Sequence, residues 1–112
     1  MEQEDTVSPQ LWRALDGYDI ESGFGRTCPS CKQEYEAGDR LVVCTERPPS
    51  TSEWSVTSVV CRECGQRSLS DDERRSSVEQ ALVSVELTVA AMTLVLDGET
   101  PRLLDRSPAS ET

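Results

Sequence analysis

The sequence predicts a small, mostly-β fold that one metal ion holds together at its centre. Two CxxC pairs, Cys28 with Cys31 and Cys61 with Cys64, can point four sulfur atoms at one position, and 29 residues (32–60) separate the pairs. Stretches rich in valine and threonine lie between the pairs and after them, which is typical of β-strands. The hydrophobic content is 36% and the aromatic content 4% of 112 residues, so the chain can form only a small hydrophobic core. A bound metal ion that cross-links the fold is therefore favoured.

The chain divides into five segments. They are an acidic tail (1–7), a short N-terminal helix with a loop (8–25), the metal-binding module (26–67), a C-terminal helix and β extension (68–106) and a polar tail (107–112). The first helix begins with Ser8 as N-cap and Pro9 at the first helical position, and Gly17 can end it. Its apolar stripe consists of Leu11, Trp12 and Leu15. This stripe either packs on the chain's own core or offers Trp12 as an anchor for a protein partner.

Two strands are predicted between the cysteine pairs. Residues 40–46 and 53–60 are rich in β-branched side chains, and the prolines and serines of 48–52 form the loop between them. The second strand runs directly into Cys61. A β-hairpin that joins two CxxC knuckles in this way is the layout of a zinc ribbon.

A helix and a β-hairpin are predicted after the second cysteine pair. Residues 70–73 (SDDE) match a capping box, which predicts a helix that ends near Gln80. Residues 81–96 fit both helical and strand spacing, and their valine and threonine content favours one long strand. Asp-Gly at 97–98 is a hairpin turn signal, and 102–106 is the short return strand.

The metal expected in the four-cysteine site is a single structural Zn²⁺, because zinc accepts a closed set of thiolates. Iron is the lesser alternative, since the same ligands bind it. The fifth cysteine, Cys44, lies on a predicted strand and is expected to be a small core residue. An odd cysteine count and the lack of an export signal predict reduced thiols in the cytoplasm. The longest apolar stretch, 87–96, is too short to cross a membrane.

Two motifs, Cys28-Pro29-Ser30-Cys31 and Cys61-Arg62-Glu63-Cys64-Gly65, carry a resemblance to a known class of proteins. Residues 26–67 resemble the small archaeal zinc-ribbon proteins, especially the acidic ones of haloarchaea. The sequence departs from the family pattern at Lys32, where a glycine is expected, and its second knuckle lacks the proline. The resemblance implies a zinc-binding fold without one uniform function, because such ribbons serve as nucleic-acid binders, subunit adaptors and structural clips.

The knuckle spacing also resembles that of rubredoxin, which holds one iron in two CxxC knuckles and carries electrons. Tyr35, four residues after Cys31, fits that comparison. Lys32 again stands in place of a glycine, and three aromatic residues lie outside the module: Trp12, Tyr18 and Phe24. The resemblance makes a rubredoxin-like electron carrier the third functional hypothesis.

The net charge is −10 with a pI near 4.4, and only one of the eleven basic residues is a lysine. This composition is typical of proteins from salt-loving archaea, in which an acidic surface stays solvated. Four basic residues lie within three positions of a metal cysteine: Arg26, Lys32, Arg62 and Arg67. They either balance the negative charge of a zinc tetrathiolate or form, with Arg40 and Arg47, a basic tip for nucleic-acid phosphates.

Catalysis is not expected from this sequence. It contains no histidine, which is the usual general base, and four thiolates leave zinc no open position for a substrate. The first hypothesis is a non-enzymatic structural-zinc module, regulatory in character, that contacts a protein partner or self-associates through the 81–96 strand. Nucleic-acid binding is the second hypothesis, and neither a membrane nor a small-molecule substrate is expected.

Overall fold

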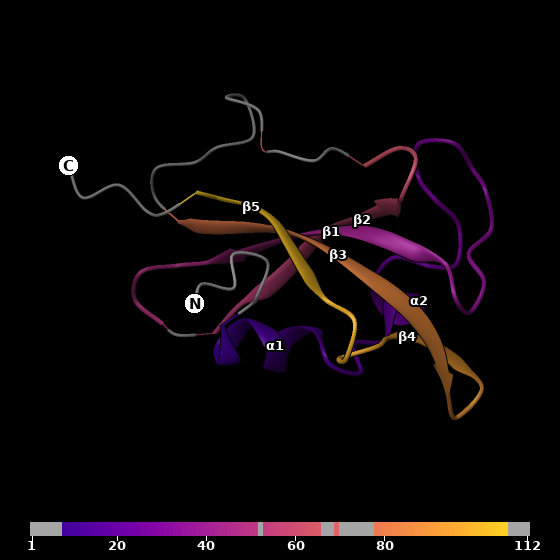
Figure 1. Cartoon of the computed structure of the whole chain (residues 1–112), viewed down its shortest axis with the longest axis horizontal. Helices are drawn as coiled ribbons and strands as arrows, with labels where there is room; N and C mark the ends of the chain where they lie inside the picture. Colours follow the sequence, from indigo (N-terminus) through magenta and orange to yellow (C-terminus); the bar gives the residue numbers. More distant parts are fainter. Residues whose placement is uncertain (1–7, 52, 66–68, 70–77, 108–112) are drawn as a thin grey trace.

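The computed structural model describes residues 8–51, 53–65, 69 and 78–107. In these residues a curled antiparallel sheet of five strands packs with two short helices (Figure 1). In chain order the elements are α1 (Pro9–Leu15), α2 (Ile20–Gly23), β1 (Arg40–Arg47), β2 (Ser55–Cys61), β3 (Glu79–Ala90), β4 (Thr93–Leu96) and β5 (Arg102–Ser107). The fold is therefore small and mostly β, as predicted. Neither helix has the length or apolarity needed to span a membrane.

Strand β3 is the centre of the sheet. The strand order is β2-β1-β3-β4, and β5 also pairs with β3. β1 pairs with residues 79–86 of β3 along one edge. The opposite edge of β3 pairs with β5 near its beginning and with β4 through residues 87–90 near its end. The predicted pairing of the two strands between the knuckles is present as β1 with β2, and β1 is also part of the larger sheet.

The prediction of one long strand over 81–96 is wrong. The chain reverses at Ala91 and Met92, so that β3 and β4 form an antiparallel hairpin. Both turn residues have positive φ values, 52° and 67°, which fits the two-residue turns that match the twist of paired strands. Asparagine and glycine are the usual residues in such turns, and their absence explains why residues 91–92 carry no turn signal.

The predicted C-terminal helix lies mostly outside the described residues, since 70–77 are among those omitted. At its expected end, Glu79 and Gln80 are not helical but begin β3. Gln80 is 2% exposed and pairs with Glu46 of β1 and Ser107 of β5. The sheet on both sides therefore determines the conformation of this segment.

The N-terminal helix forms as predicted. Ser8 Oγ accepts a hydrogen bond from the Leu11 backbone N–H at 3.2 Å, and Gly17 adopts a φ of 74° after the helix ends. The segment after it was predicted to be a loop, but it contains the single-turn helix α2. Asp19 caps α2 because its carboxylate accepts from the backbone N–H groups of Glu21 and Ser22.

The core lies mainly on the face of the sheet that the helices cover. Leu11, Leu15 and Ile20 of the helices pack there with strand residues that include Val43 and Val83. The opposite face carries a smaller cluster, which contains Val42, Leu69 and Leu82 with Cys44, Val60 and Leu104 at its margin. Cys44 is half-buried in this position, which agrees with its predicted role as a small packing residue.

Candidate metal centre

The first CxxC pair lies in a tight hairpin that its own backbone holds together. Thr27 and Glu34 form an antiparallel bridge, and the Cys28 N–H donates to the Gln33 carbonyl at 2.9 Å. The Lys32 N–H closes the turn by donating to the Cys28 carbonyl, also at 2.9 Å. Lys32 has a φ of 69°, in the region that glycine adopts without strain. This conformation explains why a glycine is expected at the position.

The second CxxC pair follows the last residue of β2 without a break. Cys61 ends the strand, and its carbonyl accepts from the N–H groups of Cys64 (3.1 Å) and Gly65 (2.9 Å). A Cβ atom on Gly65 would lie within 2.3 Å of a Val42 methyl group, so only glycine lets this turn pack against β1. The sheet thus fixes the direction in which Cys61 and Cys64 point.

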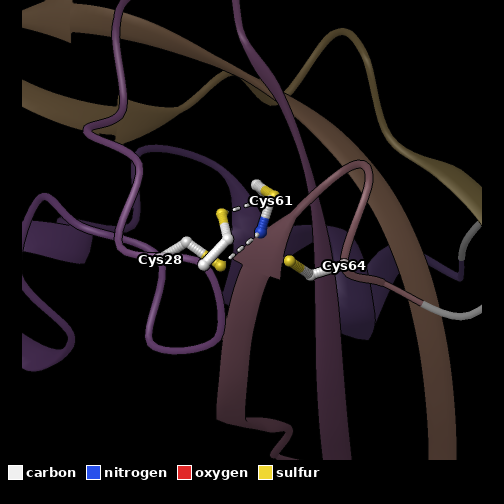
Figure 2. Close-up of side chains that lie close together, drawn as sticks. Cys28, Cys61 and Cys64 are labelled. Atoms are coloured by element: carbon white, nitrogen blue, oxygen red, sulfur yellow. Dashed lines mark hydrogen bonds between the residues drawn. The ribbon is translucent and has the colours of Figure 1, made fainter.

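The four cysteine sulfur atoms lie close together around one common position. Their Sγ atoms all lie within 4.8 Å of one another, and those of Cys31 and Cys61 are 3.7 Å apart. Figure 2 shows the Cys28, Cys61 and Cys64 side chains turned toward one another at the end of β2. A tetrahedron with zinc–sulfur bonds of about 2.3 Å has sulfur–sulfur edges of about 3.8 Å. The thiols are thus spaced for one tetrahedral ion, and none is joined in a disulfide.

The electrostatics of the thiols also fit a bound cation. Burial opposes ionisation of Cys28, but hydrogen bonds from backbone N–H groups, that of Cys61 foremost, lower its pKa to about 6. Contact with the thiols of Cys61 and Cys31 raises the pKa of Cys64 to about 12. Metal ligation requires thiolates, so a divalent cation bound here would displace the protons that the thiols still carry.

A tyrosine buried beneath the sulfurs joins the two knuckles. Tyr35 is 3% exposed, its backbone N–H donates to the Arg26 carbonyl (2.7 Å), and its hydroxyl donates to the Val59 carbonyl (3.4 Å). Burial, together with the negative charge expected on Cys28, raises the pKa of its phenol above the ordinary value. Tyr35 therefore stays a neutral donor and positions β2 relative to the first hairpin. In the sequence, only the spacing of Tyr35 from Cys31 indicated that this tyrosine belongs to the site.

The described basic residues near the cysteines lie on the surface, and of these Arg62 borders one hollow together with Arg40 of β1. Arg26 faces Glu21 at 3.6 Å, and the Lys32 ammonium donates to the Pro29 carbonyl at 3.3 Å. Arg62 is exposed next to Cys61, and Arg67 lies outside the described residues.

The two arginines predicted to extend a basic tip make contacts inside the sheet. Arg40 donates to the Ser84 hydroxyl at 2.8 Å and to the Thr100 carbonyl at 3.2 Å. Arg47 binds the Glu79 carboxylate. Neither guanidinium group therefore points freely toward the metal centre.

Trp12, the predicted partner anchor, is used partly within the chain. Its side chain is 41% exposed, and its indole N–H donates to the Gly98 carbonyl at 2.6 Å. This bond ties α1 to the turn that follows β4.

Both knuckles lie in the part of the chain that a family model matches, residues 6–99. The chain belongs to the family described as Domain of unknown function (DUF8112). The matched range also includes α1, α2 and β1 to β4, and it ends before β5. No curated protein and no solved structure matches the chain. The archaeal and halophilic origin stays a prediction.

Proposed function

We propose that the chain is a non-enzymatic zinc-ribbon module whose single structural Zn²⁺ shapes a surface for protein contacts. The observation that carries the proposal is the convergence of four cysteine Sγ atoms to within 4.8 Å of one another. Four thiolates fill the coordination sphere of zinc, so no position is left for water or substrate. A structural role follows from that closed sphere.

The proposed ion joins two parts of the chain that are distant in sequence. Cys28 and Cys31 belong to the first hairpin, whereas Cys61 and Cys64 belong to the end of β2. Structural zinc contributes roughly 10–16 kcal/mol to folding in zinc-finger peptides at neutral pH. Metal loss is therefore expected to release the first hairpin from the sheet.

Protein contact is favoured over nucleic-acid binding by the surroundings of the site. A hollow of about 300 Å³ beside Cys61 is bordered by Glu34, Asp39, Glu63 and Glu86 against Arg40 and Arg62, a balance of four acids to two bases. Such a rim repels phosphates. The proposal requires a reducing compartment, of which the cytoplasm is the expected one, because disulfide formation would remove the ligands.

Elemental analysis of the purified chain, with its visible absorption spectrum, tests the proposed ion. One zinc per chain, with unfolding at lower temperature after chelation, is the expected result. Red colour and one iron per chain would replace the proposal with the rubredoxin-like alternative, since iron thiolates absorb visible light and zinc thiolates do not. Stable folding in the absence of any metal would overturn the structural role.

A further inference from the structure

The four cysteines of the candidate metal centre differ in their access to solvent. Cys28 is 0% exposed, Cys61 and Cys64 are half-buried, and Cys31 alone of the four is exposed. The residues around Cys31 in the first hairpin, 29–34, are all exposed as well. An exposed thiolate reacts with oxidants more readily than a buried one, so a small oxidant that diffuses in from solvent reaches the Cys31 sulfur first.

The sulfur atom that Cys31 contacts belongs to the other CxxC pair. Cys31 Sγ and Cys61 Sγ are 3.7 Å apart. A disulfide bond is about 2.0 Å long, so the two sulfur atoms need to approach each other by about 1.7 Å to form one. Neither side chain is buried, so no close-packed core opposes this movement. Cys61 is therefore a partner within reach of an oxidised Cys31.

Cys28, the other cysteine of the first pair, is held in place by a backbone hydrogen bond. The Cys61 N–H donates to Cys28 Sγ at 3.4 Å, which Figure 2 marks with a dashed line. A disulfide between Cys28 and Cys31 would draw this sulfur away from the N–H group and leave a half-buried donor without its acceptor. A disulfide between Cys31 and Cys61 requires no change in this bond. The hydrogen bonding thus favours the second of these two disulfides.

The two disulfides also differ in what they connect. A Cys28–Cys31 disulfide lies within one turn and adds no link between the first hairpin and the sheet. A Cys31–Cys61 disulfide joins the first hairpin to the end of β2, the same two parts that the proposed ion joins. It also closes a long loop, which restricts the unfolded chain. The link between hairpin and sheet is therefore kept when the ion is lost.

We propose that the candidate metal centre is a reversible, peroxide-sensitive switch in which a Cys31–Cys61 disulfide takes the place of the ion. This inference rests on the proposed function, because the switch has its metal-bound state only if the four thiolates bind zinc. It adds regulation to that site. Exchange with the thiols of a reducing compartment returns the disulfide to two thiolates and restores the ligands.

The oxidation balances with one hydrogen peroxide for each disulfide. The Cys31 thiolate attacks one peroxide oxygen, the O–O bond breaks, and a sulfenic acid forms on Cys31 as hydroxide leaves. The Cys61 thiolate then attacks the Cys31 sulfur, the S–O bond breaks, and a second hydroxide leaves as the S–S bond forms. The two sulfur atoms together give up two electrons, which reduce the peroxide, and solvent protons convert both hydroxides to water. Cys28 and Cys64 remain as two thiolates, too few to hold zinc.

The test adds hydrogen peroxide to the zinc-loaded full chain that carries Cys44→Ser, which removes the one cysteine outside the centre. A chromophoric chelator measures the zinc released, and trypsin digestion with mass spectrometry locates the disulfide. Trypsin cleaves after lysine and arginine except before proline, which places the four cysteines on three peptides, 27–32, 41–62 and 63–67. The expected results are one zinc released for each peroxide consumed, and peptide 27–32 joined through Cys31 to peptide 41–62.

The same chain, freed of zinc and unfolded in urea, is the control. In an unfolded chain the shortest loops close most readily, so disulfides within each CxxC pair are expected. They appear as a disulfide within peptide 27–32 and a link between peptides 41–62 and 63–67. A folded chain that gives the same disulfides as the unfolded one would overturn the inference, because the arrangement of the sulfur atoms would then have no effect.

Zinc release with the Cys31–Cys61 disulfide, reversed by dithiothreitol and added zinc to one zinc per chain, supports the switch. Three results would overturn it: zinc retained at a peroxide concentration that oxidises free glutathione, another disulfide as the main product, or zinc loss that dithiothreitol does not reverse. Zinc content before the peroxide is added separates the two proposals. A chain without zinc at that stage fails the proposed function, whereas a zinc-loaded chain that gives another disulfide fails only the switch.

Discussion

The Tyr35 hydroxyl donates a hydrogen bond to the Val59 carbonyl at 3.4 Å, two residues before Cys61 of the candidate metal centre. The first hairpin and the edge strand β2 are therefore joined by a side chain as well as by the proposed ion. Tyr35→Phe is expected to destabilise the zinc-loaded protein by about 1 kcal/mol, because the buried carbonyl loses its donor. Urea unfolding measures the change.

The control for this substitution is Tyr18→Phe. The Tyr18 hydroxyl makes no hydrogen bond with other residues that the structure describes, so its removal is expected to change stability by less than about 0.5 kcal/mol. Equal effects of the two substitutions would contradict the role assigned to Tyr35.

Cys31 and Cys44 provide a matched pair of substitutions for the metal centre. Cys31→Ser removes one ligand of the cluster and is expected to abolish stoichiometric zinc binding and lower the unfolding temperature. Cys44→Ser makes the same chemical change on β1, outside the cluster, and is expected to leave one zinc per chain. Zinc content and thermal unfolding of both variants check this, and retained tight binding in Cys31→Ser would refute the four-ligand site.

The Glu79 carboxylate predicts a dependence of stability on pH. Burial acts to raise its pKa, but the hydrogen bonds and charges of Arg106 and Arg47 outweigh burial and hold the pKa below the ordinary value. A depressed folded-state pKa stabilises the protein above the unfolded value of about 4.3, and this contribution is lost as the pH falls through the folded value. Glu79→Gln is expected to cost about 2 kcal/mol at neutral pH.

Urea unfolding of the wild type and of Glu79→Gln across the acid range tests this dependence. The difference between the two proteins should shrink as the pH falls, whereas any acid release of zinc affects both alike. A difference that stays constant at every pH would mean that the charge of Glu79 contributes nothing.

The backbone of Lys32 allows a stabilising substitution. Its φ of 69° costs a residue with a Cβ atom about 1 kcal/mol, which glycine avoids. Lys32→Gly is therefore expected to stabilise the zinc-loaded protein by about that amount in urea unfolding. Lys32→Ala removes the same charged side chain but keeps the strained backbone, so an equal gain in both variants would assign the effect to charge.

The turn between β3 and β4 offers a second test of backbone strain. Ala91 and Met92 have φ values of 52° and 67°, and replacing them by Asn and Gly is expected to stabilise the hairpin by about 1 kcal/mol. Ala90→Gly, at the end of β3, is the control and is expected to destabilise by about 0.5 kcal/mol, because its backbone is extended. Thermal unfolding ranks the variants, and a destabilising Asn-Gly turn would contradict the geometry.

The features that depend on neighbouring residues were predictable from the sequence. The four ligands follow from CxxC spacing, and the Ser8 cap follows from a Ser-Pro start. The strands predicted at 40–46 and 53–60 correspond to β1 and β2, with ends that differ by one or two residues. These signals are local, so the rest of the fold does not alter them.

The features that depend on distant partners were not predictable. The β3–β4 turn uses Ala91 and Met92, which carry no turn signal, because core packing of Leu87 and Leu94 fixes the hairpin.

The simple alternation of side chains between the two faces of the sheet also fails on β2. An irregularity between Cys44 and Thr45 sets Ser58 opposite Cys44 but Val56 opposite Thr45, so the two β2 residues face opposite sides of the sheet.

The order of the elements along the chain has a consequence for how the protein is made. All four cysteines of the candidate metal centre precede residue 65, whereas β3, the partner of β1 along its whole length, begins at Glu79. Chains emerge from the ribosome N-terminus first at roughly 5–20 residues per second, so the four cysteines leave the ribosome before β3 does. The ion can then hold β1 and β2 as a template, and β3 adds to an edge that is already in register. Metal supply during translation, rather than after release, would then govern the yield of folded protein.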